Sequence, residues 1–339
     1  MGLRLTVLAA LGVGVLAAPC GGFNANNLTK GANVLGKAGD TAEKMGDCKK
    51  LDVDPSVSEE YALGGALAIH FVQRGGGLLL EKPREPGDKS KVRRPGEALH
   101  DYINVVGKNL AAQSQRPTLE WTFGVLGDTK QFNAVSAPGG YVFISRKVIE
   151  TVENEGQLAG VLAHEISHVV LKHAIRQYNE VKVKTCKAVA VGEAFLSPGA
   201  VAALSAGKQG DGTLDLDKEP SLLGNLAEKT VDTFDNGNPP ELEDEADRMA
   251  ARLMLSAGYD PDDYRRLIAK TTEETRLANH PKKAERVKKL VAYIKTLKDN
   301  EGEFQELTTE GLHSPPLKTS ALAALRGSTA TGVAKDGVK

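Results

Sequence analysis

The sequence predicts a mainly helical α+β fold with a small β-sheet. Apolar residues at helical spacing predominate between residues 55 and 299. Two short runs, 118–125 and 141–144, are instead rich in β-branched and aromatic residues, which favours strands. The hydrophobic content of 41% in 339 residues is enough for a proper core. The net charge of -1 excludes a long-range attraction to nucleic acid or to an anionic membrane.

The N-terminus has the pattern of an export signal over residues 1–20. A short positive region ends at Arg4, and the apolar stretch 5–18 is too short to span a membrane. Cys20 follows the apolar stretch and suggests a bacterial lipoprotein with an acylated cysteine, although Pro19 departs from the usual lipobox. Ordinary signal cleavage is the alternative, and the sequence leaves both open.

The remaining chain divides into three expected parts. Residues 21–54 predict a tether, residues 55–299 a single domain, and residues 300–339 a partly disordered tail. The first half of the domain is expected to contain a helix from 55 to a glycine break at 75–77, an exposed loop at 82–96 and a helix at about 97–113. The two strands follow, with a turn at 138–140. The second half is expected to contain a helix around 157–171, a mobile loop at 207–238 and a helix that begins near 239.

The most informative motif is the pentapeptide His-Glu-Ile-Ser-His from His164 to His168. Residues four apart share one face of a helix, so both histidines can present a nitrogen to one zinc ion. Glu165 then lies beside the metal and in reach of its bound water, as a general base should. A surface helix with scattered histidines is the alternative, so the motif needs support from elsewhere in the chain.

A candidate third ligand lies in the acidic run 241–247. Catalytic zinc sites keep three protein ligands and leave one position for water, so two histidines require one more. Glu243 and Asp247 share a helix face, which lets Glu243 ligate while Asp247 accepts the second N–H of a zinc histidine. The run is also typical of a solvated helix start after Pro239 and Pro240. Periodicity alone does not say which glutamate faces inward.

Collinear motifs over roughly residues 55–295 resemble the HtpX/BepA-type zinc metalloproteases, a gluzincin group that also includes the CAAX prenyl endopeptidases. The motifs are YINVVG at 102–107, FNA at 132–134, PGGYVFI at 138–144, NEGQLA at 154–159, the HExxH helix, EDEAD at 243–247, AGYDP at 257–261, and His280-Pro281 followed by Glu285-Arg286. The resemblance implies one Zn²⁺ per chain, bound by His164, His168 and Glu243, with Asp247 orienting a ligand histidine. One departure is Pro239-Pro240, where relatives usually have Ser-Arg; it concerns the helix entry rather than the ligands.

The resemblance also implies the compact zincin architecture, in which an edge strand lies above the metal. Substrate adds to that edge as a further antiparallel strand. The candidate edge is residues 133–144, and the expected substrate-binding residues are Asn133, Gly139, Gly140, Tyr141 and Val142. On the residues alone, the asparagine and the glycines are typical of ordinary turn chemistry.

Three further side chains receive separate predictions. His280 matches the His-Pro segment of the family, so it is expected near the zinc, where it gates the open coordination position or stabilises the oxyanion. A plain helix-start residue is the alternative. Arg286 is expected to add positive charge to the same intermediate. His173 lies five residues after His168, on a different side of the helix, and is expected to be packed or hydrogen-bonded rather than a ligand.

Beyond Cys20, the cysteines are Cys48 and Cys186. An exported protein encounters a compartment that permits disulfides. Because Cys48 lies in the expected tether, the sequence favours two unpaired thiols over a bridge.

The expected function is that of a zinc-dependent endopeptidase of the cell envelope, acting on misfolded or misassembled proteins. A chaperone-like assembly factor is the first alternative, with a protease site kept latent by His280 and the 207–238 loop. A binding module with structural zinc is the second, and Glu165 argues against it because a structural site has no use for a base. Expected partners are polypeptide substrates and envelope assembly machinery, not nucleic acid. The expected location is the bacterial periplasm, with membrane attachment if Cys20 is lipidated.

Overall fold

The structure, a computed structural model, describes residues 48–79, 95–127, 133–190, 238–270, 283–299 and 316–317. Its elements are, in chain order, η1 (Cys48–Leu51), α2 (Val57–Arg74), α3 (Pro95–Ala112), β1 (Thr122–Leu126), β2 (Ala134–Ala137), β3 (Tyr141–Ser145), α4 (Arg146–Thr151), α5 (Glu155–Val170), α6 (His173–Ala190), α9 (Pro240–Ser256), α10 (Pro261–Lys270) and α11 (Lys283–Asp299). The predicted fold class is confirmed: these ranges form a mainly helical α+β fold with a small mixed sheet. Within them, every helix is too short or too polar to cross a membrane. The expected export signal, Cys20 and all but the last residue of the expected loop at 207–238 lie outside the described residues.

The sheet has the strand order β1-β3-β2. β3 pairs in parallel with β1 and antiparallel with β2, where Val135 lies opposite Phe143. The prediction of a free edge is therefore wrong for Tyr141 and Val142, because both sides of their strand are occupied. The turn at 138–140 reverses the chain direction, so β2, in the first half of the predicted edge at 133–144, pairs with β3, in its second half. Among the described residues, β2 is left as the edge strand on this side of the sheet.

The turn between β2 and β3 requires its glycines. Gly139 and Gly140 have φ of +79° and +96°, a backbone region that other residues rarely adopt. Helix α2 also approaches this turn closely, since a Cβ at Gly64 would lie 1.8 Å from the carbonyl oxygen of Pro138. The Gly139 N–H donates to Oε1 of Glu60 on α2 at 3.1 Å. These contacts hold the turn, and with it the edge strand, against α2.

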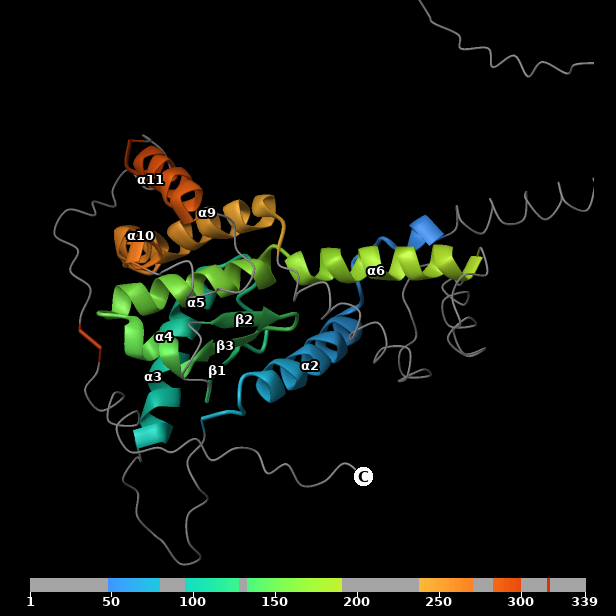
Figure 1. The fold of residues 1–339 in the computed structure, drawn as a ribbon, viewed down its shortest axis with the longest axis horizontal. Helices are drawn as coiled ribbons and strands as arrows, with labels where there is room; N and C mark the ends of the chain where they lie inside the picture. Colours follow the sequence, from blue (N-terminus) through green and yellow to red (C-terminus); the bar gives the residue numbers. More distant parts are fainter. Residues whose placement is uncertain are drawn as a thin grey trace, which may run out of the picture.

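Helix α5 lies at the centre of the fold, between the sheet on one side and α9 and α10 on the other (Figure 1). Helix α2 packs on β2 and β3, and α3 packs on β1 and α5. Asn154 caps α5, because its side-chain oxygen accepts from the Gln157 N–H at 2.8 Å. Every side chain from Gly156 to Val170 is buried. The HExxH motif of this helix therefore lies inside the protein, where its polar groups need partners.

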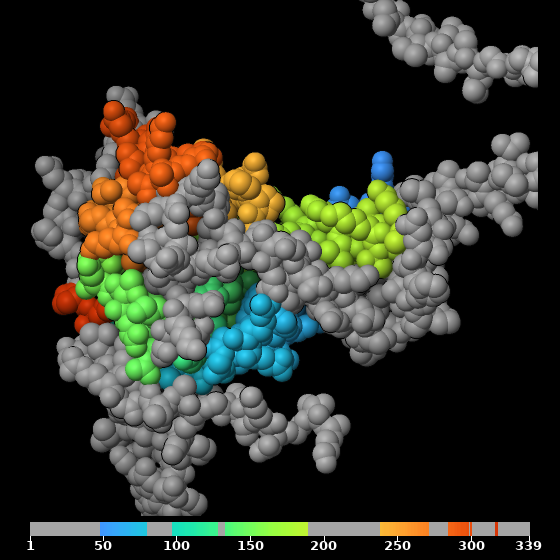
Figure 2. All heavy atoms as spheres, viewed as in Figure 1, coloured from blue at the N-terminus to red at the C-terminus, as the bar shows by residue number. Residues whose placement is uncertain are grey.

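Two residues separate α5 from α6, and the second of them, Lys172, has a φ of 57°. Helix α6 runs away from the sheet towards η1 and forms a broad part of the surface in Figure 2. Near its C-terminal end, Cys186 forms a disulfide with Cys48 of η1. The prediction of two unpaired thiols is wrong, because η1 packs against α6 and Cys48 is only 1% exposed. Such a bond is consistent with an oxidising compartment.

Candidate metal centre

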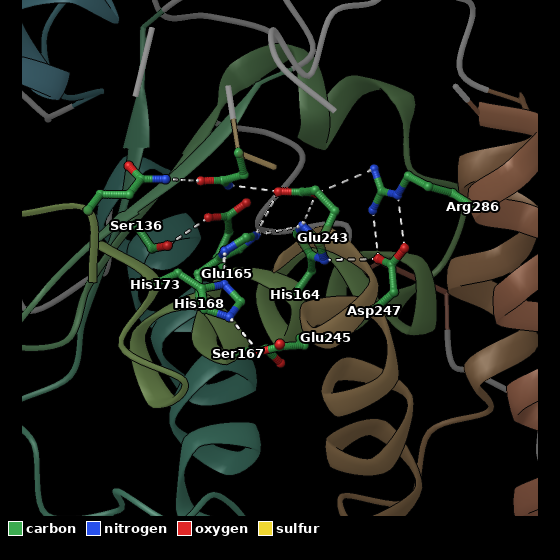
Figure 3. Close-up of polar contacts among 12 residues, drawn as sticks. Ser136, His164, Glu165, Ser167, His168, His173, Glu243, Glu245, Asp247 and Arg286 are labelled. Atoms are coloured by element: carbon green, nitrogen blue, oxygen red, sulfur yellow. Dashed lines mark hydrogen bonds and ion pairs between the residues drawn. The ribbon is translucent and has the colours of Figure 1, made fainter. Parts of the chain in front are cut away.

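Three buried side chains from α5 and α9 converge (Figure 3). His164 and His168 bring their Nε2 atoms to 3.1 Å from each other. Each of these nitrogens lies 3.3 Å from a different carboxylate oxygen of Glu243. Within the described part of the chain, these three residues form the group of side chains placed to hold a metal ion together. Two imidazoles and one carboxylate are the ligands of many hydrolytic zinc sites, so the donor set fits zinc.

The first histidine is oriented from α9 and α11. His164 Nδ1 lies 3.0 Å from Oδ1 of Asp247. Arg286 donates to both oxygens of Asp247, through Nε at 2.9 Å and Nη2 at 2.6 Å. The Tyr264 hydroxyl donates to the same Oδ1 at 3.0 Å. Since Asp247 engages the guanidinium in this way, a contribution of Arg286 to an oxyanion stays a prediction.

The charges around His164 favour a cation. Burial alone would lower the pKa of His164, but hydrogen bonds and negative charge from Asp247 and Glu243 raise it to about 9. Burial acts to raise the pKa of Asp247, but the positive charge of Arg286 and the hydrogen bond to His164 hold it below its usual range. A metal ion at this point competes with the proton on His164, because a ligand histidine must be deprotonated.

The second histidine is oriented from α6. His168 Nδ1 lies 2.8 Å from Nδ1 of His173, the first residue of α6. The other ring nitrogen of His173, Nε2, lies 3.4 Å from Oε2 of Glu245. Burial, followed by the charges of His168 and Arg176, lowers the pKa of His173 to about 3, so its ring is neutral. As predicted, His173 is a hydrogen-bonded residue outside the group of three.

The carboxylate is oriented by two amide side chains. Asn238 Nδ2 donates to Oε1 of Glu243 at 2.7 Å. Gln177 of α6 donates in turn to Oδ1 of Asn238 at 2.9 Å. Asn238 stands directly before Pro239 and Pro240, at the start of α9.

Glu165 lies beside the group of three but does not belong to it. It is 4% exposed, and its Oε2 accepts from the Ser136 hydroxyl at 2.9 Å. Ser136 is part of the edge strand β2, so this contact joins the candidate base to the edge of the sheet (Figure 3).

Comparison with known proteins agrees with this geometry. A family model described as peptidase family M48 matches residues 97–294, more than half of the chain. The chain belongs to peptidase family M48. The resemblance predicted from the sequence motifs is thereby confirmed, and the M48 match includes both histidines of the HExxH helix and Glu243.

Curated relatives of this M48 protein include bacterial and mitochondrial proteases. It is 30% identical over 185 residues to the beta-barrel assembly-enhancing protease of Yersinia pestis, and 27% identical over 185 residues to that of Escherichia coli (strain K12). These matches cover 54% of this chain and 35% and 34% of the two relatives. It is also 33% identical over 85 residues, 25% of each chain, to the mitochondrial metalloendopeptidase OMA1 of Schizosaccharomyces pombe. The chain therefore spans about a third of the length of the bacterial relatives.

The remaining predicted site residues lie in the turn, at the start of the edge strand or outside the described residues. His280 lies outside the described residues. Asn133 precedes β2, and its N–H donates to the Ser145 hydroxyl at 3.1 Å, which ties the start of the edge strand to the end of β3. Gly139 and Gly140 lie in the turn.

Sequence reasoning missed four residues that contact the centre or its partners, namely Ser136, Gln177, Asn238 and Tyr264. One signal was available in principle. A buried ligand must have partners for its remaining polar atoms, so the second nitrogen of His168 and the oxygens of Glu243 required donors or acceptors from somewhere. Nothing in the local sequence says which segments supply them.

Proposed function

We propose that this M48 protein is a zinc-dependent endopeptidase that binds one Zn²⁺ per chain. The observation that carries the proposal is the position of Glu165: a buried carboxylate adjoins the His-His-Glu group without belonging to it. A structural zinc site has no use for such a group, whereas peptide hydrolysis requires a base at this place. The family membership supports the same chemistry.

The residues of the centre take distinct roles in this proposal. His164, His168 and Glu243 would hold the zinc ion, which supplies a Lewis acid that activates water and polarises the scissile carbonyl. Glu165 accepts the proton of the attacking water and later delivers it to the leaving amine. Asp247 keeps the ring of His164 in place, because its carboxylate contacts Nδ1 while Nε2 faces the other ligands.

The substrate is proposed to bind along β2. An extended peptide that adds to this edge is held by backbone hydrogen bonds, with little demand on its sequence. The contact between Ser136 and Glu165 supports this placement, because it brings the edge strand directly to the base. Recognition through the backbone selects unfolded or loosely folded polypeptides, since a folded substrate already uses these backbone groups.

We place the protein in the bacterial cell envelope, where it removes misfolded or misassembled proteins. Three observations support this location and role: the export-signal pattern at the N-terminus, the disulfide between Cys48 and Cys186, and bacterial relatives named for β-barrel assembly. The names of these relatives also favour the second candidate, an envelope assembly factor whose protease site is mostly latent. Coverage of the metal by His280 and residues 207–238 is the proposed cause of that latency.

Glu165→Gln tests the proposal in the chain without residues 1–20. The substrate is an unfolded β-barrel protein of the outer membrane, and zinc is quantified by atomic spectrometry. We expect the variant to keep one zinc per chain and to cleave nothing, because the amide is no base. The matched control is Glu180→Gln, whose carboxylate is 66% exposed on α6. Loss of zinc from Glu165→Gln, or cleavage at the parent rate, would overturn the role of Glu165.

Two further comparisons complete the test. Glu243→Ala should lose most of its zinc while Glu241→Ala keeps it, because Glu241 is exposed and Glu243 is fully buried. A parent protein that binds zinc and prevents aggregation of the unfolded substrate, but does not cleave it, would favour the latent assembly factor.

A further inference from the structure

Helix α6 supplies an orienting group for two of the three expected ligands, although it contributes no ligand itself. We propose that His173 and Gln177, one turn apart on α6, are positioning residues: His173 fixes the ring of His168, and Gln177 fixes Glu243 through Asn238. This inference rests on the metal site of the proposed function.

The hydrogen-bond pattern defines the role of His173. Nε2 of His168 faces His164 and Glu243, so in a metal ligand its Nδ1 carries the proton. That proton is donated to Nδ1 of His173 at 2.8 Å. His173 accepts through Nδ1 and therefore carries its own proton on Nε2, which faces Glu245. The series from His168 through His173 to Glu245 thus fixes one tautomer and one ring orientation of the ligand.

The role of Gln177 follows from the entry of α9. Pro239 and Pro240 have no backbone N–H, so these two positions cannot donate to a nearby carboxylate. The donor to Oε1 of Glu243 is instead the side-chain amide of Asn238, at 2.7 Å. An amide can rotate, but the oxygen of Asn238 accepts from Gln177 at 2.9 Å, and Gln177 is only 5% exposed. Gln177 therefore holds the amide of Asn238 with its oxygen towards α6 and its nitrogen towards Glu243.

Helix α6 is anchored well enough to transmit a fixed geometry. The Tyr178 hydroxyl donates to Oε1 of Glu59 on α2 at 2.9 Å, and the ammonium of Lys182 lies 4.7 Å from the ring centre of Tyr178. Further along, the disulfide holds Cys186 to Cys48. These contacts are made to residues other than the ligands, so the positions of His173 and Gln177 do not depend on the ligands alone.

Zinc affinity of the full chain tests the proposal without any need for proteolysis. The dissociation constant is measured by competition with a chromophoric chelator, and the visible spectrum of the Co²⁺ form reports the ligand geometry. We expect His173→Leu and Gln177→Leu each to weaken zinc binding about 10- to 100-fold, the usual effect of losing a partner of a metal ligand. Both variants should also alter the Co²⁺ spectrum.

Asn179→Leu is the matched control. Asn179 is a buried amide on the same helix, 5% exposed, and it donates at 2.9 Å to the carbonyl of Val53, away from the ligands. This variant should destabilise the fold much as Gln177→Leu does, yet leave zinc affinity and the Co²⁺ spectrum at the parent values. His173→Gln should recover part of the lost affinity, because its amide oxygen can accept the proton of His168.

The outcomes separate positioning from support of the fold. Equal losses of affinity in Gln177→Leu and Asn179→Leu, or none in His173→Leu, would overturn the proposal. Adding Gln177→Leu to Asn238→Ala should weaken zinc binding no further, whereas additive losses would rule out the contact through Asn238. Failure of the proposed function would look different: zinc binding would depend on α6 as described, but no peptide would be cleaved.

Discussion

Replacement of Arg286 by alanine should strongly destabilise the protein. Arg286 is 5% exposed, and its two hydrogen bonds to Asp247 bring a positive charge to a carboxylate that is 3% exposed. Without the arginine, Asp247 keeps its buried charge and loses the cation of α11, so that protonated His164, at 3.0 Å, is the cation left beside it. Breaking a buried pair in this way costs about 3–5 kcal/mol of unfolding free energy. The positive charge of Arg286 also holds the pKa of Asp247 low, so its removal should raise that pKa.

Denaturant titration of the metal-free protein at neutral pH measures this cost. The control is Arg265→Ala, because Arg265 pairs with Asp262 at 2.7 Å but both side chains are more than a quarter exposed. Such a pair is worth about 0–1 kcal/mol. The deficit of Arg286→Ala should shrink as the pH falls, because the raised pKa lets Asp247 take up a proton and lose its buried charge.

Two results would refute the reasoning. The first is an unfolding free energy for Arg286→Ala within the range of the Arg265→Ala control. The second is a deficit that does not respond to acidification. If Arg286 acted only on the oxyanion, kcat would fall while the stability of the metal-free protein stayed unchanged.

Three further predictions concern the base, the proton on a ligand and the disulfide. Ser136→Ala should lower kcat with KM and zinc content unchanged, because the carboxylate of Glu165 loses the hydrogen bond that holds it in place. Ser136→Thr should restore kcat, since it keeps a hydroxyl at this position. A loss of zinc from Ser136→Ala would contradict this role. The pKa of His164 is raised from 6.5 to about 9, so protonated His164 should contribute about 3 kcal/mol to the unfolding free energy of the metal-free protein. This contribution is complete below pH 6.5 and is lost as the pH rises through 9. Zinc binding at pH 7 should therefore release a proton from His164, which calorimetry in buffers of different ionisation enthalpy detects, and a buffer-independent heat would exclude it. Joint replacement of Cys48 and Cys186 by serine should lower the unfolding free energy by about 2–5 kcal/mol, because the disulfide links residues 138 positions apart and so closes a long loop. An unchanged denaturation midpoint would show that the bond does not form.

Much of the candidate centre could be predicted before the fold was known. His164 and His168 lie just over one turn of helix apart, so helix geometry alone places the two histidines on one face. Glu243 required more, because the acidic run offers three glutamates and periodicity does not select one. The motif of the family supplied that register, and the burial of Glu243 between exposed Glu241 and Glu245 agrees with it.

Whatever depends on residues within a few positions of each other was determined by the sequence: helices α2, α3, α5 and α9, strands β1 and β3, the HExxH pair and the glycine turn. Contacts between distant segments were decided only by the tertiary structure. The hairpin pairs β2 with β3, so Tyr141 and Val142 lie in the central strand of the sheet and β2 is an edge strand. Packing of η1 on α6 brings Cys48 to Cys186 across the sequence. Burial of α5 leaves its polar atoms in need of partners. Asp247 was expected in that role from its helix spacing and the family motif, whereas only the packing of α6 against α5 decides that His173 is the partner of His168.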